Sequence, residues 1–235
     1  EAGTYGSNAS LVVLRAGAQL CVQADRRTRA SSFPLRLARR RLNAALGRMS
    51  ERVPSMLARL WGLAGGRPED PSCDWNATFD PVGLILHAPP RRAEYWCTPM
   101  NTITFAGTGG DGVHYGLLSI DGAVTDFSPV VMTVPMSDTP NMIVGANLKE
   151  FLALGCRFGY FALEQLVYAR DATIEELELG RYDPDASAAE LALLAKLSRE
   201  FALVPWQRPR ARLDELKVGY LDKLVVQPLV PEHAS

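Results

Sequence analysis

The residues with the clearest chemical potential form a glycine-rich stretch, Gly107–Gly112 (GTGGDG), close to His114. Backbone N–H groups of such loops can hold a phosphate, and glycine lets the ligand approach closely. However, a Walker loop needs Gly-Lys-Ser or Gly-Lys-Thr before a helix, and a dinucleotide-binding loop also needs a helix after it. Here the stretch enters a β-rich run. Two interpretations stay open: a site for a small phosphorylated or nucleotide substrate, and a strand connection whose glycines take positive φ while Asp111 hydrogen-bonds its own turn.

His114 could act as a base beside the carboxylate of Asp111, three residues earlier. On a strand that begins near Gly112, His114 shares a face with Gly116, and the apolar residues around it point the other way. We therefore expect His114 on the solvent-facing side of the strand, as a surface residue rather than a catalyst.

No complete catalytic or metal-binding motif accompanies this histidine. The sequence has no G-x-S-x-G elbow and no H-E-x-x-H helix, and His87 and His233 have no recognisable partners. The cysteines are widely and irregularly spaced, without a C-x-x-C pair: Cys21, Cys73, Cys97 and Cys156. Because zinc ligands usually come in closely spaced pairs, a site completed by His87 or His114 is disfavoured. We expect no metal, no cofactor and reduced thiols in a cytoplasmic protein.

A second polar group, Asp138, Asn141 and Asn147, falls between a β-rich run and the helix after it. Pro135 and Pro140 stiffen this stretch, which predicts a rigid, exposed connection of the kind that often carries recognition. The binding residues expected from the sequence are Gly109, Gly110, Asp111, His114, Asp138 and Asn141.

The element pattern around these residues predicts a β-sheet. Runs rich in Val, Ile, Thr, Tyr and Phe are separated by glycine and Asp-Gly turn signals, which is typical of an antiparallel meander. The expected strands are Val82–Ala88, Thr102–Phe105, Val113–Ile120 and Val130–Pro135, and the two prolines after the first run predict a turn there. The fold class is therefore α+β, with an antiparallel sheet of four to six strands from residues 73 to 145, covered by helices from both ends.

Helix signals dominate the chain after the sheet. Three residues suited to an N-cap, Asn147, Thr173 and Ser187, each precede a glutamate by three positions. We expect a helix after each of them, a buried helix over Phe158–Arg170, and a last helix over Arg212–Leu224. Before the sheet, an amphipathic pattern predicts helices from residue 35 to residue 63.

The net charge of −1 conceals two oppositely charged parts. Between Arg26 and Arg67 there are eleven arginines and one acid, whereas residues 68–235 have an excess of ten acids. The basic part is interpreted as a solvated amphipathic helix, a surface for an anionic partner, or an upstream extension. Among anionic partners, nucleic acid is disfavoured, because no aromatic residues interleave with the arginines to stack on bases.

Composition and length set the remaining bounds. The chain has 235 residues, of which 47% are hydrophobic and 22% charged, as in ordinary globular proteins. No apolar run approaches the roughly 18 residues that a membrane-spanning helix needs. A Gly- and Pro-rich stretch at residues 64–71 predicts a boundary between a basic segment, residues 1–70, and an α+β domain, residues 71–235.

The central block resembles the SUKH superfamily, which includes bacterial immunity proteins against secreted nuclease toxins and fungal regulators of cell-wall assembly. The resemblance rests on three stretches: Thr104–Tyr115, Pro129–Met132 and Asn147–Leu152. The block is also similar to bacterial proteins of unassigned function that continue into a segment like Cys156–Leu166. The first resemblance covers about residues 100–155, and the second reaches about residue 224. The SUKH resemblance implies an α+β fold without cofactor or catalysis, whose members act by protein–protein binding.

The leading hypothesis is accordingly a non-catalytic protein-binding module of the immunity type. The alternative is an enzyme that binds a small phosphorylated or nucleotide substrate at the Gly107–Gly112 loop. It predicts a pocket beside the loop in which His114 and a second polar group converge, whereas a shallow surface favours the binding module. A third hypothesis, nucleic-acid binding through Arg26–Arg67, predicts strongly salt-dependent retention on DNA.

Overall fold

The computed structural model describes residues 53–65 and 74–227. Every described residue belongs to one compact unit, which lies within residues 41–235. The helix expected over residues 35–53 and most of the arginine-rich part lie outside the described ranges. The boundary expected at residues 64–71 falls largely there too. No helix within the described ranges is long and apolar enough to cross a membrane.

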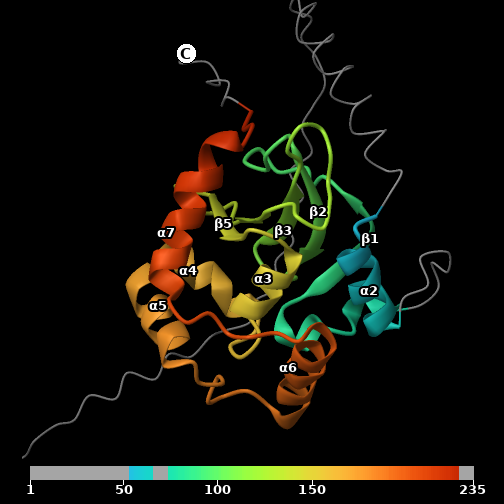
Figure 1. Cartoon of the computed structure of the whole chain (residues 1–235), viewed down its shortest axis with the longest axis vertical. Helices are drawn as coiled ribbons and strands as arrows, with labels where there is room; N and C mark the ends of the chain where they lie inside the picture. The colour runs from blue at the N-terminus through green and yellow to red at the C-terminus, as the bar shows by residue number, and fades with distance from the viewer. Residues whose placement is uncertain (1–52, 66–73, 228–235) are drawn as a thin grey trace, which may run out of the picture. The chain divides into compact units, whose positions relative to one another are not determined.

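Five antiparallel strands form one sheet in simple meander order, which confirms the predicted α+β class (Figure 1). The strands are β1 (Ile85–Arg91), β2 (Thr102–Gly107), β3 (His114–Leu118), β4 (Val130–Thr133) and β5 (Asn141–Gly145). Two sequence predictions were wrong here. Asn141 begins β5 instead of lying in a connection, and β1 continues through Pro89 and Pro90 instead of turning. Proline is tolerated in β1 because an edge strand needs hydrogen bonds on one side only.

One face of the sheet carries the main hydrophobic core. Its large side chains alternate along the strands, as the period of two requires: Leu86, Phe105, Tyr115, Leu117 and Met132. They form one buried cluster that includes residues of α2 (Ser55–Ala64), α3 (Leu148–Leu154) and α6 (Ala188–Phe201). Burying each such side chain stabilises the fold by about 1.5–3 kcal/mol, so this face anchors the sheet.

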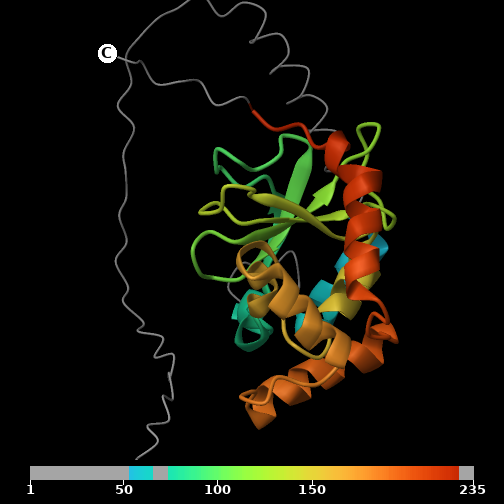
Figure 2. The ribbon, with the colours of Figure 1, turned by 90° about the vertical axis from the view of Figure 1, so that its left-hand side faces the viewer.

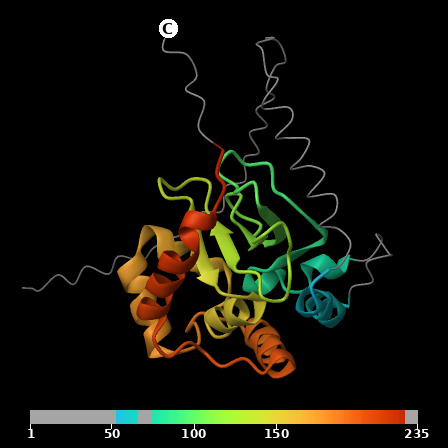
Figure 3. The same ribbon diagram turned by 45° about the horizontal axis from the view of Figure 1, so that its top comes forward.

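The opposite face is covered in two parts. At the β3–β5 end, Leu118, Val131 and Ile143 pack against Leu216 of α7 (Pro209–Tyr220). Figures 2 and 3 show α7 running alongside the sheet next to β5. At the β1–β3 end no helix of the described chain covers this face, and the connection between β1 and β2 lies there instead.

The remaining helices partly follow the sequence signals. Asn147 and Ser187 cap α3 and α6 as predicted, each accepting a hydrogen bond from the backbone N–H of the glutamate three residues later. The single helix expected over Phe158–Arg170 is wrong, because the backbone leaves helical geometry at Ala169. Thr173 does not cap a helix but lies inside one. The segments concerned are η4 (Phe161–Glu164), α4 (Gln165–Tyr168) and α5 (Arg170–Leu179).

Short 3-10 turns complete the described chain: η2 (Asp74–Ala77), η3 (Asp80–Val82) and η5 (Leu221–Lys223). The last helix, α7, begins at Pro209, three residues before the predicted start, because proline suits the first helical position.

Candidate functional site

The β1–β2 connection, residues 92–101, folds back over the sheet and is called the crossing segment here. Three backbone groups of the crossing segment are hydrogen-bonded to side chains of the sheet. Thr104 Oγ1 accepts from Ala93 N at 3.2 Å, and Thr102 Oγ1 donates to Pro99 O at 2.9 Å. Asn141 Nδ2 donates to Cys97 O at 3.0 Å. These polar side chains lie on the sheet face opposite the main core, so the sheet fixes the path of the segment.

His114 supplies a further attachment point beneath the crossing segment. Its Nδ1 lies 2.7 Å from Gly112 O, and its Nε2 lies 3.1 Å from Thr98 Oγ1. Because a carbonyl oxygen only accepts, Nδ1 carries the proton, and Nε2 then accepts from the Thr98 hydroxyl. Both ring nitrogens are therefore engaged within the fold.

The predicted solvent-facing position of His114 is wrong. Its side chain is only 4% exposed, because the crossing segment covers the face on which it lies. The Tyr95 ring stacks on the imidazole, with centroids 5.5 Å apart and planes at 20°. Burial lowers the pKa of His114, and the hydrogen bond to Gly112 O only partly opposes this effect. The ring is therefore neutral at neutral pH.

The glycine-rich loop joins β2 to β3, as the strand-connection interpretation predicts. Gly109 and Gly112 have φ of 83° and 71°, and Asp111 has φ of 47°. A Cβ on Gly112 would lie 2.5 Å from the Tyr95 ring, so glycine is needed there for space as well as conformation. The turn bond expected from Asp111 is not found, since no described residue donates a hydrogen bond to its carboxylate.

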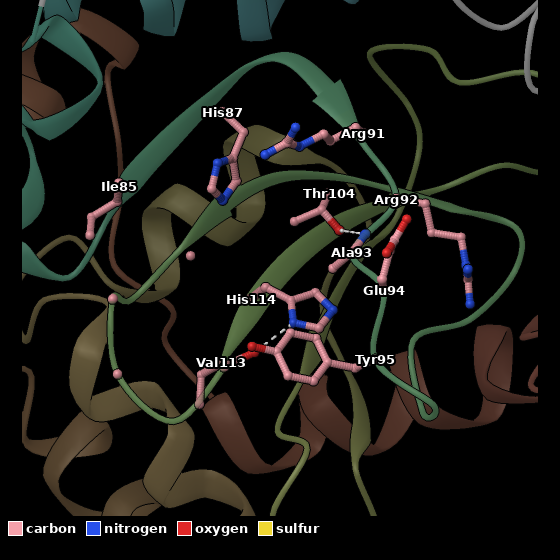
Figure 4. Close-up of a pocket in the computed structure, with 14 residues that line it drawn as sticks. Ile85, His87, Arg91, Arg92, Ala93, Glu94, Tyr95, Thr104, Val113 and His114 are labelled. Atoms are coloured by element: carbon pink, nitrogen blue, oxygen red, sulfur yellow. Dashed lines mark hydrogen bonds between the residues drawn. The ribbon is translucent and has the colours of Figure 1, made fainter. Parts of the chain in front are cut away.

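A hollow of about 610 Å³ opens beside this loop (Figure 4). Its walls come from β1, the glycine-rich loop and the start of the crossing segment. His114, with Tyr95 stacked on it, lies on one side, and His87 and Arg91 of β1 lie on the other. The pocket that the enzyme hypothesis predicts beside the loop is therefore present, with polar groups converging on it.

His87 and Arg91 are two of the lining residues that were not predicted from the sequence. Figure 4 shows the Arg91 guanidinium extending toward the His87 ring. Burial, and then the positive charge of Arg91, lower the pKa of His87, and no described residue hydrogen-bonds its ring. Their spacing of four residues could have indicated that both lie on one face of a strand. The turn expected at Pro89 and Pro90 ended the predicted strand between them, so this spacing was not used.

The six predicted binding residues separate into two places. Gly109, Gly110 and His114 line the hollow, whereas Asp111 is exposed on the loop outside the lining. Asn141 is tied to Thr133 and to the crossing segment, and Asp138 is exposed in the β4–β5 connection. Neither of the last two residues lines the hollow.

Within residues 53–65 and 74–227, no three His, Cys, Asp or Glu side chains are grouped closely enough to hold a metal ion. Cys97 and Cys156 are free, buried thiols whose pKa values are raised by burial. Cys21 and Cys73 lie outside the described ranges.

Comparison of the chain with protein-family models found no match, and comparison with curated proteins also found none.

Proposed function

We propose that the chain is a non-catalytic protein-binding module, of the immunity type that the SUKH resemblance implies. Its partner would bind the outer surface of the crossing segment and the rim of the hollow. The observation that carries this proposal is a rigid, exposed group of residues suited to protein recognition at that place.

The group consists of Tyr95, Trp96 and Arg91. Tyr95 and Trp96 are 43% and 49% exposed, and Arg91 is exposed at the end of β1. Tyrosine, tryptophan and arginine are the residues that most often dominate protein–protein binding energy. Because the hydrogen bonds from the sheet already fix the backbone beneath them, less entropy is lost when a partner binds.

The state of His114 supports the non-catalytic part of the proposal. A general base needs a free lone pair within reach of the substrate proton. The Nε2 lone pair of His114 accepts from Thr98 Oγ1, and its Nδ1–H donates to Gly112 O. The imidazole therefore serves the fold, and it would have to break a buried hydrogen bond before it could accept a proton.

Site-specific photocrosslinking tests the proposed surface. Trp96 is replaced by p-benzoylphenylalanine, and Val218, which is 84% exposed on α7, is replaced in a matched control. In extracts of the source cells we expect one discrete protein adduct from position 96 and none from position 218. The adduct should be lost when Arg91→Glu is added. No adduct at position 96, or the same adducts from both positions, would contradict the proposal.

The hollow beside the glycine-rich loop favours the alternative, an enzyme for a small phosphorylated or nucleotide substrate. In that case His87 would be the available base, since no described residue occupies its ring nitrogens. Phosphorus NMR of nucleotides and sugar phosphates incubated with the chain distinguishes the two. Product formation that disappears in His87→Asn would establish the enzyme, and unchanged spectra support the binding module.

A further inference from the structure

The hollow is lined by two arginines that form no ion pair within the described chain. Its lining contains Arg91 and Arg92 against one acid, Glu94. Among the described residues, none of these three forms an ion pair; Arg92 Nη2 instead donates to Thr98 O at 3.1 Å. Two further acids lie nearby, Asp80 beside Gly109 and Asp111 on the exposed part of the loop.

Two hydrogen-bond donors at the hollow also have no acceptor among the described residues. They are the ring N–H of His87, which is half-buried, and the Arg92 Nε, which is buried. A buried donor without a partner costs about 1–3 kcal/mol, so an acceptor supplied by a ligand would be favourable. Donors without acceptors, next to an unpaired guanidinium, match the chemistry of an oxyanion.

The opposite wall of the hollow is aromatic. One face of the Tyr95 ring stacks on His114, and the side chain remains partly exposed toward the hollow. A volume of about 610 Å³ also suits a small organic molecule better than a bare ion. We propose that the hollow binds a small organic anion, with its carboxylate or phosphate at Arg91 and His87 and its apolar part against Tyr95.

Isothermal titration calorimetry on the isolated chain tests this site, with phenyl phosphate, benzoate, inorganic phosphate and uncharged benzyl alcohol as probes. We expect phenyl phosphate or benzoate to bind at least about tenfold more tightly than benzyl alcohol, a factor worth about 1.4 kcal/mol. Whichever of the two anions binds more tightly identifies the oxyanion. Inorganic phosphate should bind more weakly than phenyl phosphate, because it makes no contact with Tyr95.

Three variants and one control locate the binding. Arg91→Gln and His87→Phe should each weaken the tighter anion about tenfold, whereas Arg199→Gln, an exposed arginine on α6, should leave it unchanged. Tyr95→Leu should weaken phenyl phosphate and leave inorganic phosphate unaffected. Circular dichroism melting curves confirm that each variant is folded.

The proposal is overturned if neither anion gives a saturable signal, if benzyl alcohol binds equally well, or if Arg91→Gln binds like the parent chain. Because no partner protein is present in this titration, its failure would leave the crosslinking result at Trp96 intact, and the reverse also holds.

Discussion

His114 illustrates how a residue with catalytic potential can instead be used to build a surface. Its two ring nitrogens connect β3 to the glycine-rich loop and to the crossing segment. The stacked Tyr95 ring then rests on it and forms a wall of the hollow. At this scale, the histidine matters because it fixes the positions of the exposed residues around it.

Removing the Thr98 hydroxyl, which donates a hydrogen bond to His114 Nε2, should therefore destabilise the fold. Thr98→Val leaves Nε2 buried without a donor, which costs about 1–3 kcal/mol in the free energy of unfolding. Urea denaturation measures this loss. Thr139→Val, at an exposed position whose hydroxyl makes no hydrogen bond to a described residue, is the control and should change stability by less than about 0.5 kcal/mol. Equal stability of both variants would contradict the role given to Thr98.

Stability should also depend on pH through the histidines. The pKa values of His114 and His87 are lowered in the folded chain, mainly by burial, whereas the unfolded chain keeps values near 6.5. Below about pH 6.5 the unfolded chain therefore binds protons first, and the free energy of unfolding falls as the pH falls. Urea denaturation between pH 7.5 and pH 6.0 should show this decline. The decline should be smaller in His87→Asn. A free energy of unfolding that stays constant over this pH range in the parent chain would contradict the lowered histidine pKa values.

The sequence predicted the residues of the glycine-rich loop better than their surroundings. Positive φ at Gly109 and Gly112 is a local property of a short strand connection, and it was predicted correctly. Strand alternation also placed His114 opposite the apolar residues. What covers that face depends on residues 92–101, which form their contacts only after the whole sheet has assembled, so burial of His114 could not be derived from its neighbours.

At the scale of elements, α2 depends on a residue far away in sequence. Its N-terminus follows Pro54 and has no side-chain cap of its own. Asp126, in the β3–β4 connection, accepts from Ser55 Oγ at 2.5 Å and from Met56 N at 2.8 Å. Burial would raise the pKa of Asp126, but these hydrogen bonds outweigh it and lower the pKa.

Loss of this cap should weaken the attachment of α2. Asp126→Ala is expected to lower the free energy of unfolding by about 1 kcal/mol, the usual value of an N-cap side chain. Hydrogen exchange should show the change first at the amides of the initial turn of α2. Asp138→Ala, at an exposed aspartate in the β4–β5 connection, should have no such effect. Equal exchange in the two variants would show that Asp126 is not the cap.

Element boundaries were predicted where a local signal decides them. The caps at Asn147 and Ser187 need only residues three positions apart, and both were predicted correctly. The strand β5 was missed because its pairing with β4 is a long-range interaction and its sequence begins with asparagine. The break at Ala169 was missed because no glycine or proline lies between Phe161 and Leu179 to signal it.

At the scale of the whole described chain, an ion pair joins α3, which packs on the main core, to α7, which packs on the opposite face of the sheet. Glu150 of α3 binds Arg212 of α7 through two contacts, at 2.6 and 3.2 Å. Glu150 Oε2 also accepts a hydrogen bond from Ala146 N at 2.6 Å. The backbone carbonyl of Glu150 accepts one from Trp206 Nε1 at 3.0 Å. The Glu150 side chain is only 21% exposed, so these bonds are partly protected from solvent.

Breaking this link should cost more than breaking an ordinary surface pair. Glu150→Ala is expected to lower the free energy of unfolding by about 1–2 kcal/mol, because charge-assisted hydrogen bonds are lost at a half-buried position. The other carboxylate that contacts Arg212 belongs to Glu215, whose side chain is 60% exposed. Glu215→Ala should therefore lower the free energy of unfolding by less than about 0.5 kcal/mol. Thermal denaturation of the pair of variants checks the difference. A larger loss in Glu215→Ala would contradict this assignment.

The proposed binding surface depends most on His114 serving as a hydrogen-bonded support rather than as a free base. Long-range ¹H–¹⁵N correlation spectra of the histidine side chains measure this directly, with Thr98→Val used to assign the resonance. We predict a neutral ring protonated at Nδ1, with Nε2 unprotonated, that stays neutral as the pH passes through 6.5. A ring protonated at Nε2, or one that titrates with an ordinary pKa near 6.5, would contradict this role of His114.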